Sequence, residues 1–520
     1  MVHCSPQRRR LCAILIKEFF GETVERVCNV LTLRGQQTLP EVVRASKLPP
    51  AAAPYFLYHA DTGAIISILR RPRILQHVQR EFGGPGDSDL VVKIIEVLLA
   101  HGRLRLDQVV AAVAARLGRP EGEVRGDMHA RFVSLINSRY IERVPPADMP
   151  LRKPAAHTKT QERKAAPKAG SQEKALQEAE AVRQLSWDSY SAERFSLPPD
   201  LLAAAPEATR DPRVAKQAGR AKRKREDAGN GSQGATAQVL WRVNLEECNC
   251  RLRDESCVEH VTEIYGREPG AVVAALLRCA ARQPGGSRLD SGASAAVSAS
   301  ASAAALMQMR RSRPELPSLT AAAVSRLLSE LAKDEKSGVA PGAALEAFTV
   351  DTGAICWAMR QKHIEALVRE RFPPIGMRVF RLLRVKKQLE QKQVADYAMV
   401  PVRDARELLY RMLRGGFLTL QDVPRTADHA ASRTFYTWRV DEAAVVRRVG
   451  EELLQAASNL RARLHHELDE SDEVLKRVEA DNSALQPRDK AVVDRVYRVS
   501  ALLDTRVIAL DPLIALFHQN

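Results

Sequence analysis

The fold is decided by residues 391–417, which read QKQVADYAMVPVRDARELLYRMLRGGF. The apolar spacing predicts a short helix over Gln393–Met399 and a second helix over Val402–Arg414. Gly415-Gly416 ends the second helix, because glycine is entropically costly inside a helix and common just after one. Two helices so close in sequence are typical of a helix-turn-helix.

The flanks of this stretch complete a larger module. A preceding helix is predicted over Gly376–Glu390, and two strands are predicted at Phe417–Val423 and Thr434–Val440, joined by the polar loop Pro424–Arg433. Three helices followed by a two-stranded wing make a winged helix, a relative of the helix-turn-helix.

The same rhythm recurs earlier in the chain. A second module is predicted from helices at Leu90–Ala100, Leu106–Leu117 and Glu121–Ser138, with an extended piece at Tyr140–Val144. A third is predicted from helical segments at Trp241–Ala281, Thr320–Leu331 and Ala354–Arg371 and a strand at Phe348–Val350. Its Ser/Ala-rich stretch, residues 291–305, is interpreted as a low-complexity surface insertion.

The two ends of the chain are predicted to be helical. At the amino end, helices are expected over Leu11–Leu33, bent near Gly21, over Thr38–Ala45, and over Ile65–Phe82, kinked at Pro72. Beyond Asp441 the apolar residues follow coiled-coil spacing, turn at Gln486-Pro487 and return, which predicts an antiparallel hairpin. Its expected seam is Val446, Val449, Leu453, Ala456, Leu460, Leu464 and Leu468.

The predicted fold class is mainly α with small β wings: tandem extended winged-helix domains followed by a carboxy-terminal antiparallel coiled-coil hairpin. Residues 147–238 are rich in Ala, Pro, Lys, Arg, Glu and Gly, which predicts a disordered linker. The expected divisions are 1–85 (winged helix 1), 86–146 (winged helix 2), 147–238 (basic linker), 239–372 (winged helix 3 with its insertion), 373–441 (winged helix 4) and 442–520 (hairpin).

Bulk composition restricts the function less than the motifs do. The net charge of +16 favours polyanionic partners such as nucleic acid, although a merely soluble basic surface has the same balance. Eight cysteines without an obvious framework, and no apolar leader, indicate a reducing compartment, cytosol or nucleus. No apolar run reaches the ~20 residues that span a bilayer, so a soluble protein without a membrane partner is expected.

No catalytic motif is present, and we expect neither an enzyme nor a cofactor. The chain lacks a P-loop, a GxGxxG after a strand and an HExxH. Cys248, Cys250, Cys257 and His260 could in principle hold zinc, but helical spacing spreads them around the cylinder, so ordinary helix cysteines and no metal are predicted. His465-His466 is interpreted as a solvated pair on the hairpin.

The third helix of a winged helix usually enters the DNA groove, which selects the candidates for nucleic-acid contact. On Val402–Arg414 these are the outward residues Arg403, Arg406, Tyr410, Arg411 and Arg414, with Lys386 and Lys387 on the first helix as further phosphate contacts. The alternative is a solvated charged face, since Asp404 and Glu407 dilute the positive charge. Module two offers a third helix with Arg125, His129, Arg131 and Arg139, again mixed with acids.

A basic cluster inside the linker has two interpretations. Its residues are Arg220, Lys222, Arg223, Lys224 and Arg225. An exposed, flexible basic run is what a nuclear-import signal needs. The alternative is a linker that is basic by accident.

The chain resembles the third-largest subunits of nuclear RNA polymerase III, which are winged-helix proteins related to the alpha chain of TFIIE. The resemblance is most specific in module four. It covers Phe380–Leu383, Leu389–Pro401, Ala405–Leu413, Asp428–Ala430 and Ser432–Tyr436, and continues at Leu11-Cys12, Phe20–Glu22, Leu99–Leu104, Arg131–Val133, Trp241, Asn244-Leu245 and Arg253-Asp254.

This resemblance implies a function. Such subunits have four extended winged helices and a coiled coil, and dock on the polymerase clamp of the largest subunit with two smaller heterotrimer subunits. They help promoter binding and opening in the synthesis of 5S ribosomal RNA and transfer RNA, and bind single- or double-stranded DNA. They are also linked to the sensing of foreign cytosolic DNA. The resemblance therefore implies a non-catalytic nuclear subunit.

One departure and two rival hypotheses remain. The family has a third helix in module one, where this chain has Leu48–Pro54, and either divergence or a missing exon would produce that gap. A free-standing TFIIE-alpha-like factor is the alternative, but it should carry a zinc ribbon, and no CxxC pair occurs here. An enzyme in the helical middle would need a convergent set of polar residues that the sequence does not show.

Overall fold

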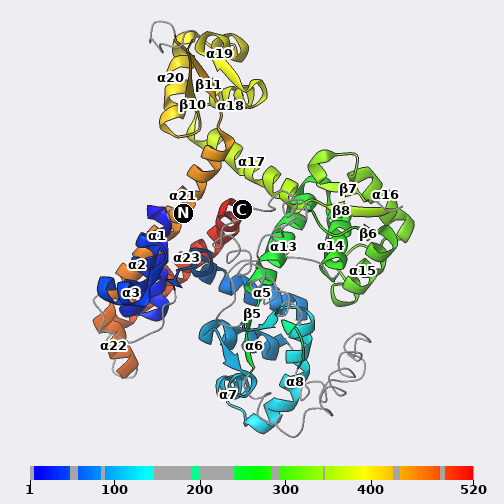
Figure 1. The fold of residues 1–520 in the computed structure, drawn as a ribbon, viewed down its shortest axis with the longest axis vertical. Helices are drawn as coiled ribbons and strands as arrows, with labels where there is room; N and C mark the ends of the chain where they lie inside the picture. Colours follow the sequence, from blue (N-terminus) through cyan, green and yellow to red (C-terminus); the bar gives the residue numbers. More distant parts are fainter. Residues whose placement is uncertain are drawn as a thin grey trace, which may run out of the picture. The chain divides into compact units, whose positions relative to one another are not determined.

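The computed structural model describes residues 5–46, 57–82, 88–145, 190, 193–197, 239–282, 293–342, 346–424, 434–480 and 487–518. Their contacts divide the chain into two compact units, residues 71–252 and residues 1–70 with 253–520, and each is described by itself. The ribbon in Figure 1 marks the elements. Among the helices in these ranges, no apolar segment has the length needed to span a bilayer. The basic cluster at 220–225 lies outside the described residues.

Module four is a winged helix, as predicted, although the helix expected over Gly376–Glu390 ends at Lys386 and Gln388–Glu390 forms a strand. Its elements are α18 (Pro374–Lys386), β9 (Gln388–Glu390), α19 (Gln391–Ala398), α20 (Val402–Arg414), β10 (Thr419–Pro424) and β11 (Thr434–Arg439). The antiparallel sheet has the order β10-β11-β9. Phe380, Leu409 and Trp438 lie in its core, because α18 and α20 each bury one apolar face against the sheet.

Module two has the same topology, but its last strand comes from a part of the chain that we expected to belong to module three. Its elements are α6 (Ser88–His101), β3 (Leu104–Arg105), α7 (Leu106–Leu117), α8 (Glu121–Asn137), β4 (Ile141–Arg143) and β5 (Leu240–Val243). Strand β5 pairs antiparallel with both β3 and β4. We expected Trp241 to open a helix of module three; instead it is a strand residue of module two, buried against Phe132.

A second correction concerns the end of module one. We expected one kinked helix over Ile65–Phe82, but the structure has α4 (Thr62–Ile66), η1 (Ser67–Arg70) and α5 (Arg71–Phe82). The division between the two compact units falls between Arg70 and Arg71. Ile74 and Val78 of α5 are buried in the core of module two, so the expected boundary at residue 85 is about one helix too late.

The third module differs from expectation at its Ser/Ala stretch. Its elements are α13 (Leu245–Tyr265), α14 (Arg267–Arg282), β6 (Val297–Ser298), α15 (Ala299–Ser312), α16 (Ala321–Leu331), η4 (Glu335–Ser337), β7 (Val339–Pro341), β8 (Ala347–Val350) and α17 (Thr352–Arg371). The stretch forms β6 and α15 rather than a surface insertion. The Ser298 side chain caps α15, alanine favours helix, and Ala303 and Leu306 are buried.

Module one packs on the carboxy-terminal helices. It contains α1 (Pro6–Phe20), α2 (Glu22–Arg34), β1 (Gln37–Thr38), α3 (Leu39–Ser46) and β2 (Leu57–Tyr58), with β1 and β2 antiparallel. The gap at Leu48–Pro54 lies outside the described residues. Leu11 and Leu15 of α1 share a core with Leu454 and Ile514.

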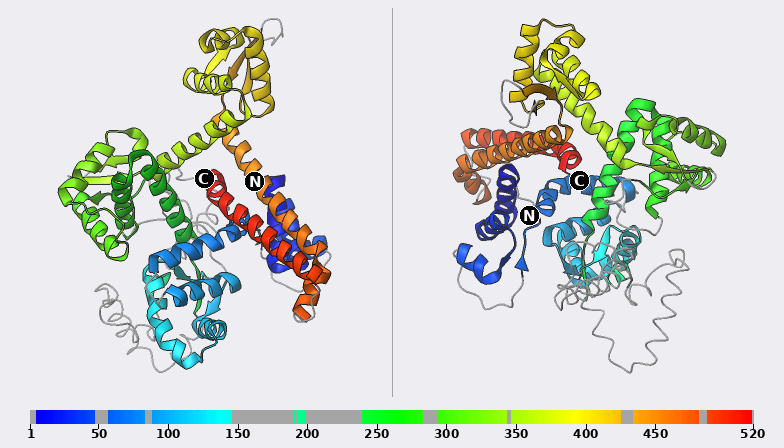
Figure 2. Two further views of the ribbon diagram at one scale, coloured as in Figure 1. Left: turned by 180° about the vertical axis from the view of Figure 1, so that it is seen from behind. Right: turned by 45° about the horizontal axis from the view of Figure 1, so that its top comes forward.

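The carboxy-terminal helices are α21 (Glu442–Glu470), α22 (Asp472–Ala480) and α23 (Pro487–His518). Helices α21 and α23 run antiparallel: His518 Nε2 lies 3.0 Å from the Gly450 carbonyl, and Arg461 lies 3.0 Å from Asp504. Figure 2 shows α21 between α23 and α1.

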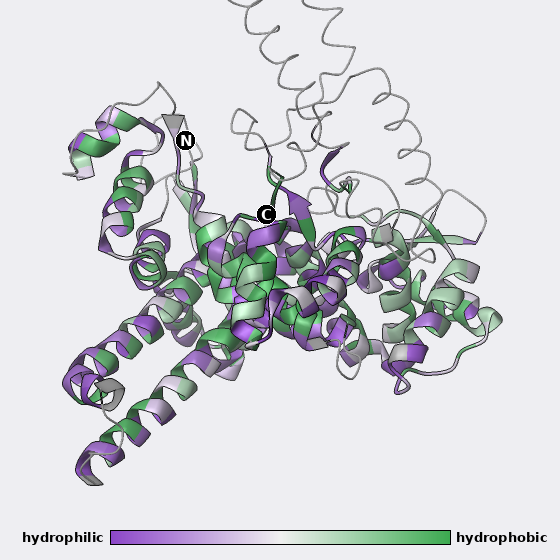
Figure 3. Ribbon diagram, turned by 90° about the horizontal axis from the view of Figure 1, so that it is seen from below, coloured by the Kyte–Doolittle hydropathy of each residue, from purple (hydrophilic) through white to green (hydrophobic). Residues whose placement is uncertain are grey.

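The buried face of α21 is broader than the expected seam. Val445, Leu454 and Ala457 are buried, whereas Val446, Leu453 and Ala456 are only half-buried. The buried face is broader because both α1 and α23 pack on α21. Hydrophobic and polar residues alternate along the helices, as in amphipathic packing (Figure 3). Regular coiled-coil packing remains a prediction.

Candidate nucleic-acid interface

Helix α20 presents arginines on its outer face. Ala405, Leu408, Leu409 and Met412 are buried beneath it, while Arg403, Arg406, Arg411 and Arg414 are exposed. The structure gives none of these four guanidinium groups an ion pair with another described residue. Asp404 and Glu407 share the face, so four cations stand against two carboxylates. A locally positive helix in the third position can meet a phosphate backbone.

Tyr410 extends this face towards the wing. Its side chain is 47% exposed, and its ring meets Trp438 of β11 edge-on, with centroids 5.2 Å apart. The contact holds the ring against the sheet and leaves part of it accessible. An aromatic ring beside arginines can stack on an unpaired base.

Lys386 and Lys387, predicted as a pair, are directed to different places. Lys386 Nζ lies 5.5 Å from the centre of the Tyr397 ring on α19, within cation–π range. Lys387 has φ 69° at the end of α18, a conformation that only a few per cent of non-glycine residues adopt. This backbone turn carries Lys387 away from its neighbour and into a hollow.

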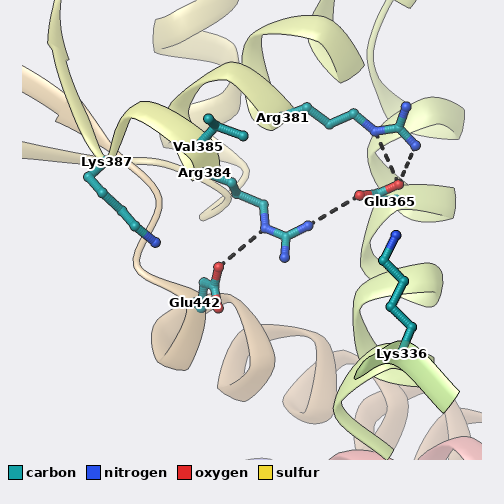
Figure 4. A pocket seen from close by; sticks show the side chains of 7 residues that line it. All are labelled: Lys336, Glu365, Arg381, Arg384, Val385, Lys387 and Glu442. Carbon is teal, nitrogen blue, oxygen red and sulfur yellow. Dashed lines mark hydrogen bonds and ion pairs between the residues drawn. The ribbon is translucent and has the colours of Figure 1, made fainter. Parts of the chain in front are cut away.

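The hollow has a volume of about 540 Å³ and is lined by Lys336, Glu365, Arg381, Arg384, Val385, Lys387 and Glu442. Arg384 bridges two carboxylates, with 3.2 Å contacts to both Glu365 and Glu442. Arg381 also binds Glu365, and this hydrogen bond raises the pKa of the guanidinium. Figure 4 shows Lys336 and Lys387 on either side of the Arg384 guanidinium. With four cations and two carboxylates, the hollow keeps an excess of positive charge.

The third helix of module two does not offer a comparable face. Arg125 is exposed on α8, but Glu121, Glu123 and Asp127 are exposed there too. His129 is half-buried, and burial followed by the nearby Arg125 charge lowers its pKa. The other two predicted residues are also withdrawn: Arg131 is half-buried, and the Arg139 guanidinium lies 5.8 Å from the centre of the Phe195 ring.

Module two instead contains a buried polar network that the sequence did not reveal. Tyr140 donates a short hydrogen bond to Glu81 and lies 3.0 Å from His77 Nε2, and Arg251 lies 3.4 Å from Glu81. Burial alone would raise the pKa of Glu81, but His77, the Arg251 charge and the Tyr140 hydroxyl outweigh burial and lower it to about 2. Burial and the Glu81 charge raise the pKa of Tyr140.

A second network of ion pairs joins β4 and β5 of the same sheet to a residue of the connection between them. Glu142 on β4 is buried and binds both Arg194 and Arg242, the latter at 2.7 Å. Arg194 comes from a short piece of the long connection, and the Arg143 amide donates a 3.0 Å backbone hydrogen bond to its carbonyl. Arg194 and Arg242 are 52 and 100 positions from Glu142 in the chain, so no local pattern could have found these pairs.

The cysteine and histidine candidates are not gathered into a metal site. No group of three or more His, Cys, Asp or Glu side chains suited to a metal occurs among the described residues. Cys248, Cys250 and Cys257 are buried along α13. His260 is also buried on this helix, including its Nε2 atom. His465 lies 3.4 Å from Glu18 on α1.

Comparison with known protein families matches three parts of the chain. Residues 364–440 match the "POLR3C, C-terminal winged-helix domain", residues 130–302 match "RNA polymerase III subunit RPC82", and residues 10–52 match the "RNA polymerase III subunit RPC82 helix-turn-helix domain". The first range covers module four with the end of α17. The second range runs through β5 and the α13–α14 pair.

Whole-chain relatives point the same way. The chain is 27% identical over 512 residues to "DNA-directed RNA polymerase III subunit RPC3" of Danio rerio, covering 92% of this chain and 88% of the relative. The protein of that name from Homo sapiens is 26% identical over 509 residues, with the same coverage of both chains. The Dictyostelium discoideum relative is 26% identical over 285 residues, 53% of this chain and 42% of its own.

Proposed function

The chain belongs to the family of RNA polymerase III subunits named RPC3 or RPC82, and from that premise we propose that it is a non-catalytic subunit of DNA-directed RNA polymerase III. The observation that carries the proposal is the relatedness over 92% of the chain, including a winged helix at 364–440 that folds as the family description requires.

Within the polymerase, we propose that the chain docks on the clamp with two smaller subunits and helps to bind and open promoters. The exposed α20 face would then contact the DNA backbone through Arg403, Arg406, Arg411 and Arg414, with Tyr410 available to stack. The paired helices α21 and α23 would offer a protein-docking surface. A nuclear location of the protein follows from this proposal. Any sensing of foreign DNA would use the same basic face of α20.

The alternative is a free-standing factor related to TFIIE alpha. The extent of relatedness to polymerase III subunits favours the subunit. The two functions predict different binding to the polymerase core. A subunit stays bound to the core when DNA is removed, whereas a free factor does not.

A tagged full-length chain recovered from nuclear extract after nuclease treatment tests the proposal. We expect the catalytic core of polymerase III and the two smaller partner subunits. An Arg403→Glu/Arg406→Glu variant is the matched control, because it should keep these proteins while losing DNA contact. Recovery of polymerase II factors alone, or loss of every polymerase subunit after nuclease treatment, would sink the proposal.

A further inference from the structure

Two cysteines from distant parts of the chain meet between α13 and α17. The sulfur atoms of Cys257 and Cys356 lie 3.8 Å apart, although 99 positions separate the residues (Figure 1 marks both helices). Cys257 is fully buried in the core of module three, whereas Cys356 is half-buried at its edge. Neither sulfur belongs to the proposed DNA-contacting face.

We propose that Cys356 and Cys257 form a peroxide-reactive dithiol, in which Cys356 is the thiol attacked first and Cys257 the resolving thiol. A disulfide needs its sulfur atoms about 2.05 Å apart, so each has to move by roughly 0.9 Å from the observed separation. Rotation about the side-chain bonds and a slight shift of the helices can supply this movement.

The surroundings give the two thiols different roles. A hydrogen bond links the two thiols, and it lowers the pKa of Cys356 and raises that of Cys257. The charges of Arg253 and Arg360 act on Cys356 in the same direction, against burial and Asp254. The thiolate is the nucleophile in thiol oxidation, and the half-buried residue is also the one a small oxidant can reach.

The reaction is balanced with a hydroperoxide as the oxidant. The Cys356 thiolate attacks one oxygen of hydrogen peroxide, giving a sulfenic acid and, after proton uptake, one water. The Cys257 sulfur then attacks the Cys356 sulfur, displaces the hydroxyl group as a second water, and closes the disulfide. Two thiols lose two electrons and two protons in total, and one peroxide is reduced to two waters.

The disulfide would link two helices that lead into different modules. Helix α13 opens module three, and α17 runs directly towards α18 of module four. Intracellular disulfides are usually transient and regulatory, because the nucleus and cytosol are reducing. Oxidation would therefore restrain α17 reversibly against α13.

Treatment of the reduced full-length chain with hydrogen peroxide tests the proposal. After non-reducing digestion, mass spectrometry should find the Cys257 and Cys356 peptides linked, and reduction should separate them. Cys257→Ser should instead accumulate a Cys356 sulfenic acid that dimedone traps, and Cys356→Ser should give neither product. Cys279→Ser is the matched control: Cys279 is also half-buried, its thiol faces the Ala301 carbonyl, and this variant should behave like the wild type.

A measurement on the wild-type protein keeps the proposal open to refutation even if a variant misfolds. In the untreated chain, Cys356 should react with iodoacetamide several times faster than Cys279. Equal rates, a Cys356 linked to a second copy of the chain, or oxidation of Cys356 to the sulfinic acid while Cys257 stays free would each overturn it.

Discussion

Modules two and four have one topology and two ways of completing it. In both, the last strand in the chain lies in the middle of the sheet, between the strand that follows the first helix and the strand that follows the third. In module four that last strand arrives after residues 425–433. In module two it arrives after residues 144–239, a roughly tenfold longer connection.

The difference shows that a long connection between two strands adds little to the free-energy cost of forming the sheet. Loop-closure entropy grows with the logarithm of length, so a tenfold longer connection costs only about 2 kcal/mol. Module two offsets this with Trp241 packed edge-on against Phe132 and with Glu142 between Arg194 and Arg242. In module four, Trp438 on the returning strand β11 likewise meets Tyr410 of α20 edge-on, while the α20 arginines face outward.

The largest expected effect is from Trp241→Ala, which removes the side chain that anchors the returning strand. Trp241 is 1% exposed, so its loss should cost about 3–5 kcal/mol. Hydrogen exchange in the full chain should show β4 amides losing protection while β11 amides keep theirs. Leu240→Ala is the control on the same strand; Leu240 is 40% exposed, and its loss should cost less than about 0.5 kcal/mol. Unchanged β4 protection in Trp241→Ala would show that β5 does not hold module two together.

The second effect is acid sensitivity of module two through Glu81. Its folded pKa of about 2 is below the ordinary value of 4.5, so its contribution is present above pH 4.5 and lost as pH falls towards 2. The loss should approach about 3 kcal/mol. Exchange protection of β4 between pH 5 and pH 2 measures it, with β11 as internal reference. Glu81→Gln should flatten this dependence; an equally steep loss in the variant would assign it to other groups.

The smallest effect concerns DNA binding and separates the two third helices. Arg403→Glu/Arg406→Glu on α20 should weaken binding of a single-stranded oligonucleotide and reduce the salt slope of log affinity by about 2, since two phosphate contacts are lost. Arg125→Glu on α8 is the matched control and should leave the slope unchanged, because three exposed carboxylates on the same helix already offset its charge. Fluorescence anisotropy over a salt series measures both. If the α20 variant keeps the wild-type slope, that helix serves protein contacts.

Module four was predictable because its signals are local. The apolar spacing of Val402–Arg414 and the glycines after it set the helix and its end, and Leu408, Leu409 and Met412 are buried on the face away from the predicted outward residues. The exposure of its arginines follows from the same periodicity. The separation of Lys386 from Lys387 was not predictable, since it depends on one positive φ at the end of α18.

Errors arose where composition or neighbourhood misled. The Ser/Ala stretch looked like a low-complexity insertion, yet alanine is both a strong helix former and small enough for close helix packing, so α15 lies in a core. The sequence also showed no sign of the contact that Cys257 makes, since local spacing compares it only with Cys248, Cys250 and His260. Its actual partner, Cys356, is 99 positions away.

The sequence by itself determined most of the helices, the two long strands of the module-four wing and the relatedness to polymerase III subunits, because helical periodicity, glycine ends and motif residues act over a few positions. Only the tertiary structure decided that β5 completes module two, that α5 lies in the core of module two, and that α1 packs on α21. The physical reason is that strand pairing and helix docking join residues far apart in the chain. Their partners are selected by shape and buried charge after the local elements exist.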